Sequence, residues 1–161
     1  VFEDNSVGVV FYVSDKYCLA MSLSESRMKW DPMFKGRRNF VNIPDEQNCN
    51  RYYVPNYADI CTNDLVQTYG TQSASAAAWC VRYGRKWHLP SAAELILLSR
   101  QANNSAITAA LSQKGGVPFK GRYWACNEHD KAMAFVVDSN GGISAAMPKT
   151  SIFQVRAVRA F

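Results

Sequence analysis

The fold is decided by the C-terminal stretch RYWACNEHDKAMAFVVDSNGGISAAMPKTSIFQVRAVRAF, which runs from Arg122 to Phe161. Short apolar, β-branched and aromatic runs alternate there with clusters of Asn, Asp, Gly, Pro and Ser, a pattern typical of an antiparallel meander. In the last run, one register buries the apolar side chains and leaves Arg156 and Arg159 at the rim. We expect strands at Arg122–Cys126, Lys131–Asp138, Ile143–Met147 and Phe153–Phe161.

The N-terminal end of the chain is expected to join this sheet. Val7–Val13 and Tyr17–Leu23 are strand-like runs joined by Ser14-Asp15-Lys16, which predicts a hairpin with a three-residue loop. Because a hairpin alone is marginally stable in water, it needs a partner. Phe153–Phe161 is the natural one, since pairing the two chain ends leaves few exposed strand edges.

Length and charge limit the possible classes of protein. The 161 residues suffice for one domain with a substantial core, and nothing in the sequence demands two. No apolar run is long enough to span a membrane, and the start at Val1 lacks the regions of a signal peptide. Val1 is not a natural initiator, so we expect a processing boundary there. The net charge of +5 permits acidic partners without indicating nucleic acid.

The five cysteines do not form a metal-binding pattern. They include no CxxC pair, and two histidines are too few to complete a zinc module. Cys18 and Cys80 lie in apolar segments and are expected to be small buried hydrophobic residues. Cys49 and Cys61 lie in a polar stretch and could form a disulfide if the protein is exported.

Residues 24–72 are expected to form a long ordered loop, because their periodicity is weak and prolines interrupt them. Within this segment, Arg27–Arg38 mixes basic residues with Trp30 and Phe34, as single-stranded nucleic-acid platforms do. The favoured interpretation is a solvated loop whose two aromatic side chains anchor it to the body. The same holds for Tyr52, Tyr53 and Tyr57.

Three helices are expected next, the third short and spanning Ser105–Gln113. Ser73 or Ser75 caps the first, and Gly84 ends it by accepting the left-handed conformation. Ser91 and Glu94 form a capping box at the start of the second.

No group of residues carries a catalytic or metal-binding pattern. His88 lacks a nucleophile elbow or a paired carboxylate, so we expect a structural or surface role. The capping position of Glu94 accounts for that carboxylate. Glu128, His129 and Asp130 are adjacent in the chain, and three adjacent side chains cannot converge on one ion from a strand end.

The order of these elements resembles that of the lectin-like C-terminal domains of bacterial, especially Bacteroides-type, surface proteins. The motifs that carry the resemblance are WHLPS from Trp87, Tyr123-Trp124 followed by Glu128, and VRAVRAF from Val155. It covers nearly the whole chain, and residues 24–72 match least. It implies an α+β, C-type lectin-like fold with paired N- and C-terminal strands, in a domain at the C-terminal part of a larger surface protein. A second, irregular sheet would present the ligand face.

A narrower resemblance links the tail to the variable proteins of diversity-generating retroelements. In those proteins, adenine-directed mutagenesis of Asn-type codons changes chosen surface positions and leaves the scaffold fixed. Met133 and Met147 cannot arise in this way, which is a departure. The matching positions here hold residues that such changes reach, namely Ala125, Cys126, Asn127, His129, Asp130, Ala132, Val136, Asp138, Ala145, Ala146, Pro148, Thr150, Ser151 and Ile152.

The sequence lacks motifs that sugar-binding lectins of this fold carry, and this limits what the resemblance implies. The EPN, QPD and WND motifs of calcium-dependent sugar binding do not occur, so neither calcium nor sugar is assumed and no cofactor is expected. No motif supports the cysteine pair of the related formylglycine-generating enzymes.

The leading hypothesis is a non-catalytic, extracellular ligand-binding domain displayed by a surface or phage protein. Its ligand would be an unidentified protein or glycan on another cell or surface, bound by residues 127–138 and 145–153. His129, Asp130, Lys131, Phe135 and Phe153 would make the main contacts, with small residues leaving concave room. The second hypothesis is a fimbrial tip or tail-fibre end that meets a fixed partner. The third is an enzyme of the related fold.

Overall fold

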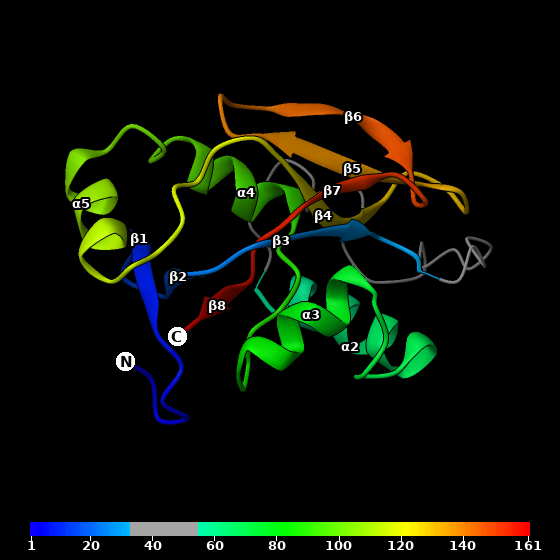
Figure 1. The fold of residues 1–161 in the computed structure, drawn as a ribbon, viewed down its shortest axis with the longest axis horizontal. Coiled ribbons are helices and arrows are strands. Elements are labelled where there is room, and N and C mark those ends of the chain that lie inside the picture. Colours follow the sequence, from blue (N-terminus) through cyan, green and yellow to red (C-terminus); the bar gives the residue numbers. More distant parts are fainter. Residues whose placement is uncertain (33–54) are drawn as a thin grey trace.

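The computed structural model describes residues 1–32 and 55–161, with the side chains of residues 143–145 excepted, and the fold is α+β. Figure 1 shows two sheets with helices packed around them. The smaller sheet has the strand order β1-β2-β8 and the larger one β3-β7-β4-β5-β6. The elements of the smaller sheet are β1 (Gly8–Val13), β2 (Cys18–Ser22) and β8 (Val158–Ala160). Those of the larger are β3 (Ser26–Lys29), β4 (Arg122–Glu128), β5 (Met133–Asp138), β6 (Ile143–Pro148) and β7 (Ile152–Val155).

The predicted pairing of the two chain ends is confirmed. β1 and β2 form the expected antiparallel hairpin, and β2 pairs with β8 from Leu19 opposite Ala160 to Met21 opposite Val158. Phe161 continues the ladder, because its backbone NH and carbonyl both hydrogen-bond to Cys18. The two termini lie close together in Figure 1. The rings of Phe2 and Phe161 also meet edge to face, with their centres 5.2 Å apart.

The last predicted strand, Phe153–Phe161, is instead two strands in different sheets. β7 pairs with β3 and β4, and β8 pairs with β2. The prediction that Arg156 and Arg159 lie at the rim is wrong, since both side chains are buried. Arg156 donates to the carbonyl of Val117 at 2.6 Å, and Arg159 donates to both carboxylate oxygens of Glu3. Carbonyls and carboxylates accept from the terminal nitrogens of both guanidinium groups, which offsets the cost of burial, while the Nε atom of each has no hydrogen-bond partner among the described residues.

The helices agree in part with the prediction. α3 (Ala76–Tyr83), α4 (Ala92–Ser99) and α5 (Ser105–Gln113) occur where expected, and Ser75 and Ser91 cap the first two. Gly84 is extended at φ 167 rather than left-handed. A Cβ atom there would lie 2.8 Å from Asp4 Oδ2, so this glycine is required for space.

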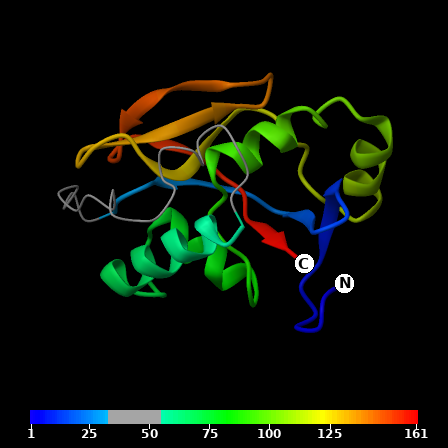
Figure 2. The same ribbon diagram turned by 180° about the vertical axis from the view of Figure 1, so that it is seen from behind.

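Residues 24–72 were predicted to form a loop, and this prediction is wrong for two segments. Residues 33–54 lie outside the described residues. β3 occupies residues 26–29, and α2 (Tyr57–Tyr69) forms a full helix. α2 buries Tyr57, Ala58, Cys61 and Leu65 on one side, so tertiary packing stabilises a helix whose sequence pattern is weak. Figure 2 shows α2 and α3 together on one side of the larger sheet.

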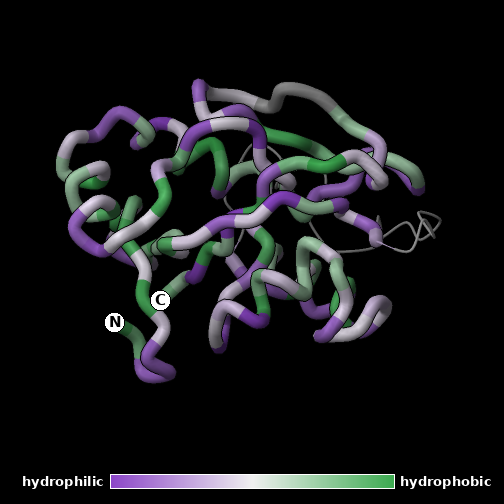
Figure 3. Tube along the Cα trace, in the orientation of Figure 1, coloured by the Kyte–Doolittle hydropathy of each residue, from purple (hydrophilic) through white to green (hydrophobic). Residues whose placement is uncertain are grey.

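The larger sheet is covered on both faces. Alternate residues of β4 point to opposite sides, so Trp124 and Cys126 pack against α2 and α3, whereas Tyr123 and Ala125 pack against β1, β2 and α4. Figure 3 shows hydrophobic residues concentrated in the strands between these layers and hydrophilic ones in the outer turns. β4 therefore lies in the middle of the core rather than at a surface.

Candidate functional site

Two loops meet at one end of the larger sheet and form what we call the loop surface, residues 129–132 and 148–152. They meet because β5 and β6 are antiparallel and place Met133 opposite Pro148. The backbone NH of Lys149 donates to the carbonyl of Ala132 at 2.9 Å. In Figure 1 the surface is the end of the sheet where the strands β6 and β7 are joined.

A buried ion pair holds the two loops together. Lys149 Nζ donates to Glu128 Oε1 and, at 3.0 Å, to the carbonyl of Lys131. Only 1% of either charged side chain is exposed. The same ammonium lies 4.6 Å from the centre of the Trp30 ring, a cation-π contact. Since a buried charge is stable only when it is paired and hydrogen-bonded, this arrangement fixes both loop backbones.

Trp30 ties a third segment to the same place. Its indole NH donates to the carbonyl of Ala125 at 2.9 Å, and the backbone NH of Asp31 donates to the carbonyl of Lys149 at 3.0 Å. Trp30 is buried, in agreement with an anchoring role, and cannot stack on a nucleic-acid base. Phe34, Tyr52 and Tyr53 lie outside the described residues, and Tyr57 is buried in α2.

The exposed part of the loop surface carries mixed chemistry. His129 Nδ1 and Asp130 Oδ2 are 3.0 Å apart with about half of each side chain exposed. The hydrogen bond from His129, followed by that from the backbone NH of Ala132, lowers the pKa of Asp130. Asp130 Oδ1 also accepts from the backbone NH of Met133, which shapes the turn. The His129 ring meets Phe135 edge to face at 5.7 Å.

Most of the residues predicted for the binding face are accessible. Lys131, Ala132, Pro148 and Ile152 are exposed along with His129, and Asp130, Phe135, Asp138, Ala146, Thr150, Ser151 and Phe153 are partly exposed. The side chain of Ala145 lies outside the described residues. Asp138 is the last residue of β5 and lies at the opposite end of that strand from Met133, which adjoins the loop surface, so the predicted residues do not form one patch.

Asn127 and Val136 were predicted to lie on the exposed binding face, and that prediction is wrong because both side chains are buried. Asn127 is 1% exposed, and its Oδ1 accepts a hydrogen bond of 2.7 Å from the backbone NH of Ala92 at the start of α4. Val136 is fully buried against the α2 and α3 side of the sheet. Ala125 and Cys126 are buried as well. The prediction failed here because helices cover both sides of the sheet at these positions, α4 at Asn127 and α2 with α3 at Val136.

The structural role predicted for His88 has a specific form, an ion cluster in which the buried imidazole forms ion pairs with the buried Glu94 and with Asp59, whose side chain is 41% exposed. The imidazole Nε2 is 2.8 Å from Glu94 Oε2, and its Nδ1 is 3.0 Å from Asp59 Oδ1. Burial alone would lower the pKa of His88, but the two carboxylates outweigh burial and raise the pKa to about 10. The imidazolium thus stays protonated at neutral pH and has no lone pair with which to act as a general base.

The other members of this cluster differ from expectation. Ser91 Oγ accepts from the backbone NH of Glu94 at 3.1 Å, as a capping box requires, but the Glu94 carboxylate contacts His88. Asp59 comes from α2, in the segment expected to be loop. No signal in the sequence links it to His88, because the contact exists only once α2 has packed.

Metal and disulfide chemistry can be assessed within the described residues. No group of three or more His, Cys, Asp or Glu side chains there could hold a metal ion. Glu128 turns inward to Lys149, and His129 turns outward. Cys61 is a free, buried thiol that donates to the carbonyl of Cys126 at 3.2 Å. Cys49, the other cysteine of the disulfide considered above, lies outside the described residues. Among the same residues, no helix combines the length and hydrophobicity needed to span a membrane.

Comparisons with known proteins yield a match in fold only. No protein-family model matches the chain, and no curated protein matches it. A fimbrial protein from Bacteroides ovatus, solved by crystallography, is similar in structure with a TM-score of 0.55 and 16% sequence identity. The match covers 88% of this chain and 35% of the fimbrial protein, so the chain spans about a third of that protein's length.

Proposed function

We propose that this chain is a non-catalytic module of an extracellular fibre of the fimbrial kind, and that it contacts its neighbour in the fibre through the loop surface. The fold shared with a Bacteroides fimbrial protein supports this proposal, and the share of that protein that is matched supports a place within a longer surface protein. A cell-surface location follows from the same proposal.

The observation that carries the proposal is the buried Lys149–Glu128 pair beneath exposed side chains. It fixes the backbone of both loops before any partner arrives. Association through a rigid surface loses little conformational entropy, which favours a permanent contact of the kind that a fibre needs. Lys131, Ala132 and Pro148 are exposed on this rigid base and are available to the partner.

The chemistry of the histidines supports a non-catalytic role. His88 is held as a cation between Glu94 and Asp59. Within the described part of the chain, neither His88 nor His129 has a serine or cysteine hydrogen-bonded to it that would serve as a nucleophile.

The test is to block the loop surface without disturbing the fold. Ala132→Arg places a bulky cation there, and Ala109→Arg makes the same change at an exposed alanine of α5. We expect cells that display the parent protein to lose most of the chain from their sheared fibres when Ala132 is replaced, and to retain it when Ala109 is replaced. Immunoblotting of the fibre fraction measures this. Equal incorporation of both variants contradicts the proposal.

A second candidate function is adhesion by a C-type lectin-like domain whose loop surface is diversified. The observation that favours it is the separation of exposed residues such as His129, Thr150 and Ser151 from the fixed base below them. Resequencing the locus in related isolates provides the test. Diversification predicts substitutions concentrated at the exposed positions of residues 129–132 and 148–152, with Asn127 and Val136 invariant. Substitutions scattered evenly along the chain rule it out.

A further inference from the structure

A recess lies at the opposite end of β5 from the loop surface. It is bounded by the C-terminal end of α4, by α5 and by the segment that leads into β4, and it has a volume of about 680 Å³. Ser139 and Asn140, which directly follow β5, line its far side. Small-molecule sites typically have volumes of about 300–1,000 Å³. A six-residue strand spans roughly 17–20 Å, so this recess is separate from the loop surface.

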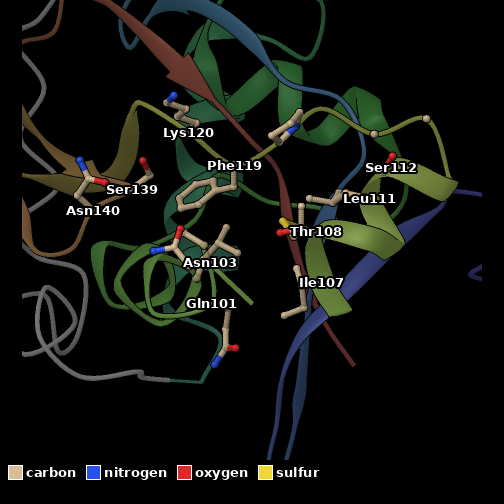
Figure 4. Close-up of a pocket in the computed structure, with 16 residues that line it drawn as sticks. Gln101, Asn103, Ile107, Thr108, Leu111, Ser112, Phe119, Lys120, Ser139 and Asn140 are labelled. Atoms are coloured by element: carbon tan, nitrogen blue, oxygen red, sulfur yellow. The ribbon is translucent and has the colours of Figure 1, made fainter. Parts of the chain in front are cut away.

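The floor of the recess is apolar and firmly held. Met21, Leu98, Leu111 and Phe119 line it, and all four are buried. The Phe119 ring stacks on Tyr123 with their centres 4.4 Å apart. Figure 4 shows Phe119 and Leu111 among the side chains around the opening. Met21 and Leu98 are fully buried, and Leu111 and Phe119 expose 4% and 6% of their surface, so a ligand reaches only the exposed edges of these last two side chains on a rigid apolar base.

One wall is formed by α5, from which Ile107, Thr108, Leu111 and Ser112 line the recess. Leu111 and the partly buried Ile107 pack on the core, whereas Thr108 and Ser112 are exposed to solvent. Leu111 is the only buried residue of α5. The helix is nevertheless fixed at both ends, because Asn104 Oδ1 accepts from the backbone NH of Ala106 and Gly116 NH donates to the Leu111 carbonyl. The wall is therefore formed in advance of binding.

The rim of the recess is polar, and its charge is positive because it comes from Lys120. The amides of Gln101, Asn103 and Asn140 lie there with hydroxyl groups of α5. Asn104 Nδ2 donates to Gln101 Oε1 at 3.0 Å, which orients that amide and leaves its NH2 group to donate. Lys120 is the only charged residue among the described residues that line the recess. With a cation present and no carboxylate, the rim favours an anionic group over a cationic one.

We propose that this recess binds a sugar that carries a carboxylate, either free or at the end of a glycan chain. A sugar ring has a C–H face that suits the Phe119 and Leu111 floor, and hydroxyl groups that suit the amides of Gln101 and Asn103. The carboxylate pairs with Lys120, where a charge-assisted hydrogen bond is stronger than a neutral one. This inference is independent of the fibre contact proposed for the loop surface.

The experiment is an NMR titration of the ¹⁵N-labelled chain with sodium glucuronate, glucose and cyclohexanecarboxylate in parallel. We expect glucuronate to shift the backbone amides of residues 101–120 and to bind most tightly. Glucose lacks the carboxylate, and cyclohexanecarboxylate lacks the hydroxyl groups. The proposal is overturned if glucuronate causes no shift in this region, or if either comparison compound binds as tightly as glucuronate. Methyl glucuronide, which has a blocked anomeric oxygen, distinguishes a chain end from the free acid.

Two variants of α5 sharpen the test. Thr108→Glu adds a carboxylate at an exposed position of the wall, and Ala109→Glu adds one at the next residue, which does not line the recess. We expect Thr108→Glu to weaken glucuronate binding at least tenfold and Ala109→Glu to leave it nearly unchanged. Lys120→Met should weaken glucuronate by about tenfold, the effect of about 1.4 kcal/mol, without affecting glucose. Equal effects of the two glutamate variants contradict the proposal.

The two proposals fail separately. Ala132→Arg on the loop surface should leave the glucuronate titration unchanged. A loss of glucuronate binding in Thr108→Glu should in turn leave incorporation into fibres unchanged.

Discussion

Asn127 and His129 are close neighbours in the chain but occupy opposite environments. Asn127 belongs to β4, which is buried on both faces, and its amide oxygen accepts from the start of α4. His129 begins the loop surface, where half of its side chain meets solvent. A residue's freedom to change is therefore set by its place in the sheet rather than by its distance along the chain. The boundary falls at Glu128, which closes the core by pairing with Lys149.

The largest expected loss of stability comes from removing the ion pair between Lys149 and Glu128. Lys149→Met leaves the Glu128 carboxylate buried without its cation and should lower the free energy of unfolding by about 3–5 kcal/mol. Lys131→Met removes a lysine charge from an exposed position of the loop surface and should change the free energy of unfolding by less than about 0.5 kcal/mol. Urea denaturation followed by circular dichroism measures both.

The double variant Lys149→Met with Glu128→Leu removes the unpaired charge as well. It should recover at least half of the lost stability, because an apolar pair often replaces a buried ion pair at little loss. If Lys149→Met is as stable as Lys131→Met, the pair does not hold the loops.

His88 and His129 should differ in how much they contribute to the pH dependence of the free energy of unfolding. The folded-state pKa of His88, about 10, lies above the usual 6.5, so its ion cluster stabilises the fold fully below about pH 6.5. This contribution is lost as pH rises toward 10, with a slope of about 1.4 kcal/mol per pH unit. Urea titrations from pH 6.5 to 10 should show this slope for the natural sequence and for His129→Gln.

The dependence of the free energy of unfolding on pH should be much weaker in His88→Gln, because a glutamine between Asp59 and Glu94 does not bind a proton. A slope that is the same in all three proteins would mean that His88 does not titrate in this way.

The smallest effect in this series concerns Asn127 itself. Asn127→Ala leaves the backbone NH of Ala92 buried without its acceptor and should lower the free energy of unfolding by about 1–3 kcal/mol. His129→Ala, at an exposed position, should change it by less than about 0.5 kcal/mol. Thermal and urea denaturation check the difference. Equal stability of the two variants would place Asn127 with the loop surface and restore it as a candidate contact residue.

The local sequence predicted much of the fold. The N-terminal hairpin, the cap at Ser75 and the bounds of α5 follow from patterns within a few residues, where hydrogen bonds are local. The last run also contains two adjacent apolar residues, Ala157 and Val158, which break its alternation close to the point where the chain passes from β7 to β8. The same break in alternation occurs in a single irregular strand, so the sequence does not distinguish one strand from two.

The candidate site was predicted less completely. The resemblance to the variable proteins pointed to His129 and Thr150, and Lys131 was included as a polar contact group within the same face. The error at Asn127 and Val136 has a different origin. Alternation reveals which residues share a face of a strand, but it does not reveal whether a helix from elsewhere in the chain covers that face.

The sequence by itself determined the N-terminal hairpin and the strand-rich tail, since these depend on short-range patterns of apolar and turn-forming residues. The pairing of the chain ends followed from the need to cover the strand edges of that hairpin, and the α+β class from the resemblance. Tertiary structure alone decided that Arg156 and Arg159 lie in the core, that Asp59 meets His88, and that Lys149 closes over Glu128. Charged side chains are buried only where partners from distant segments satisfy them, and such partners exist only after the layers have packed.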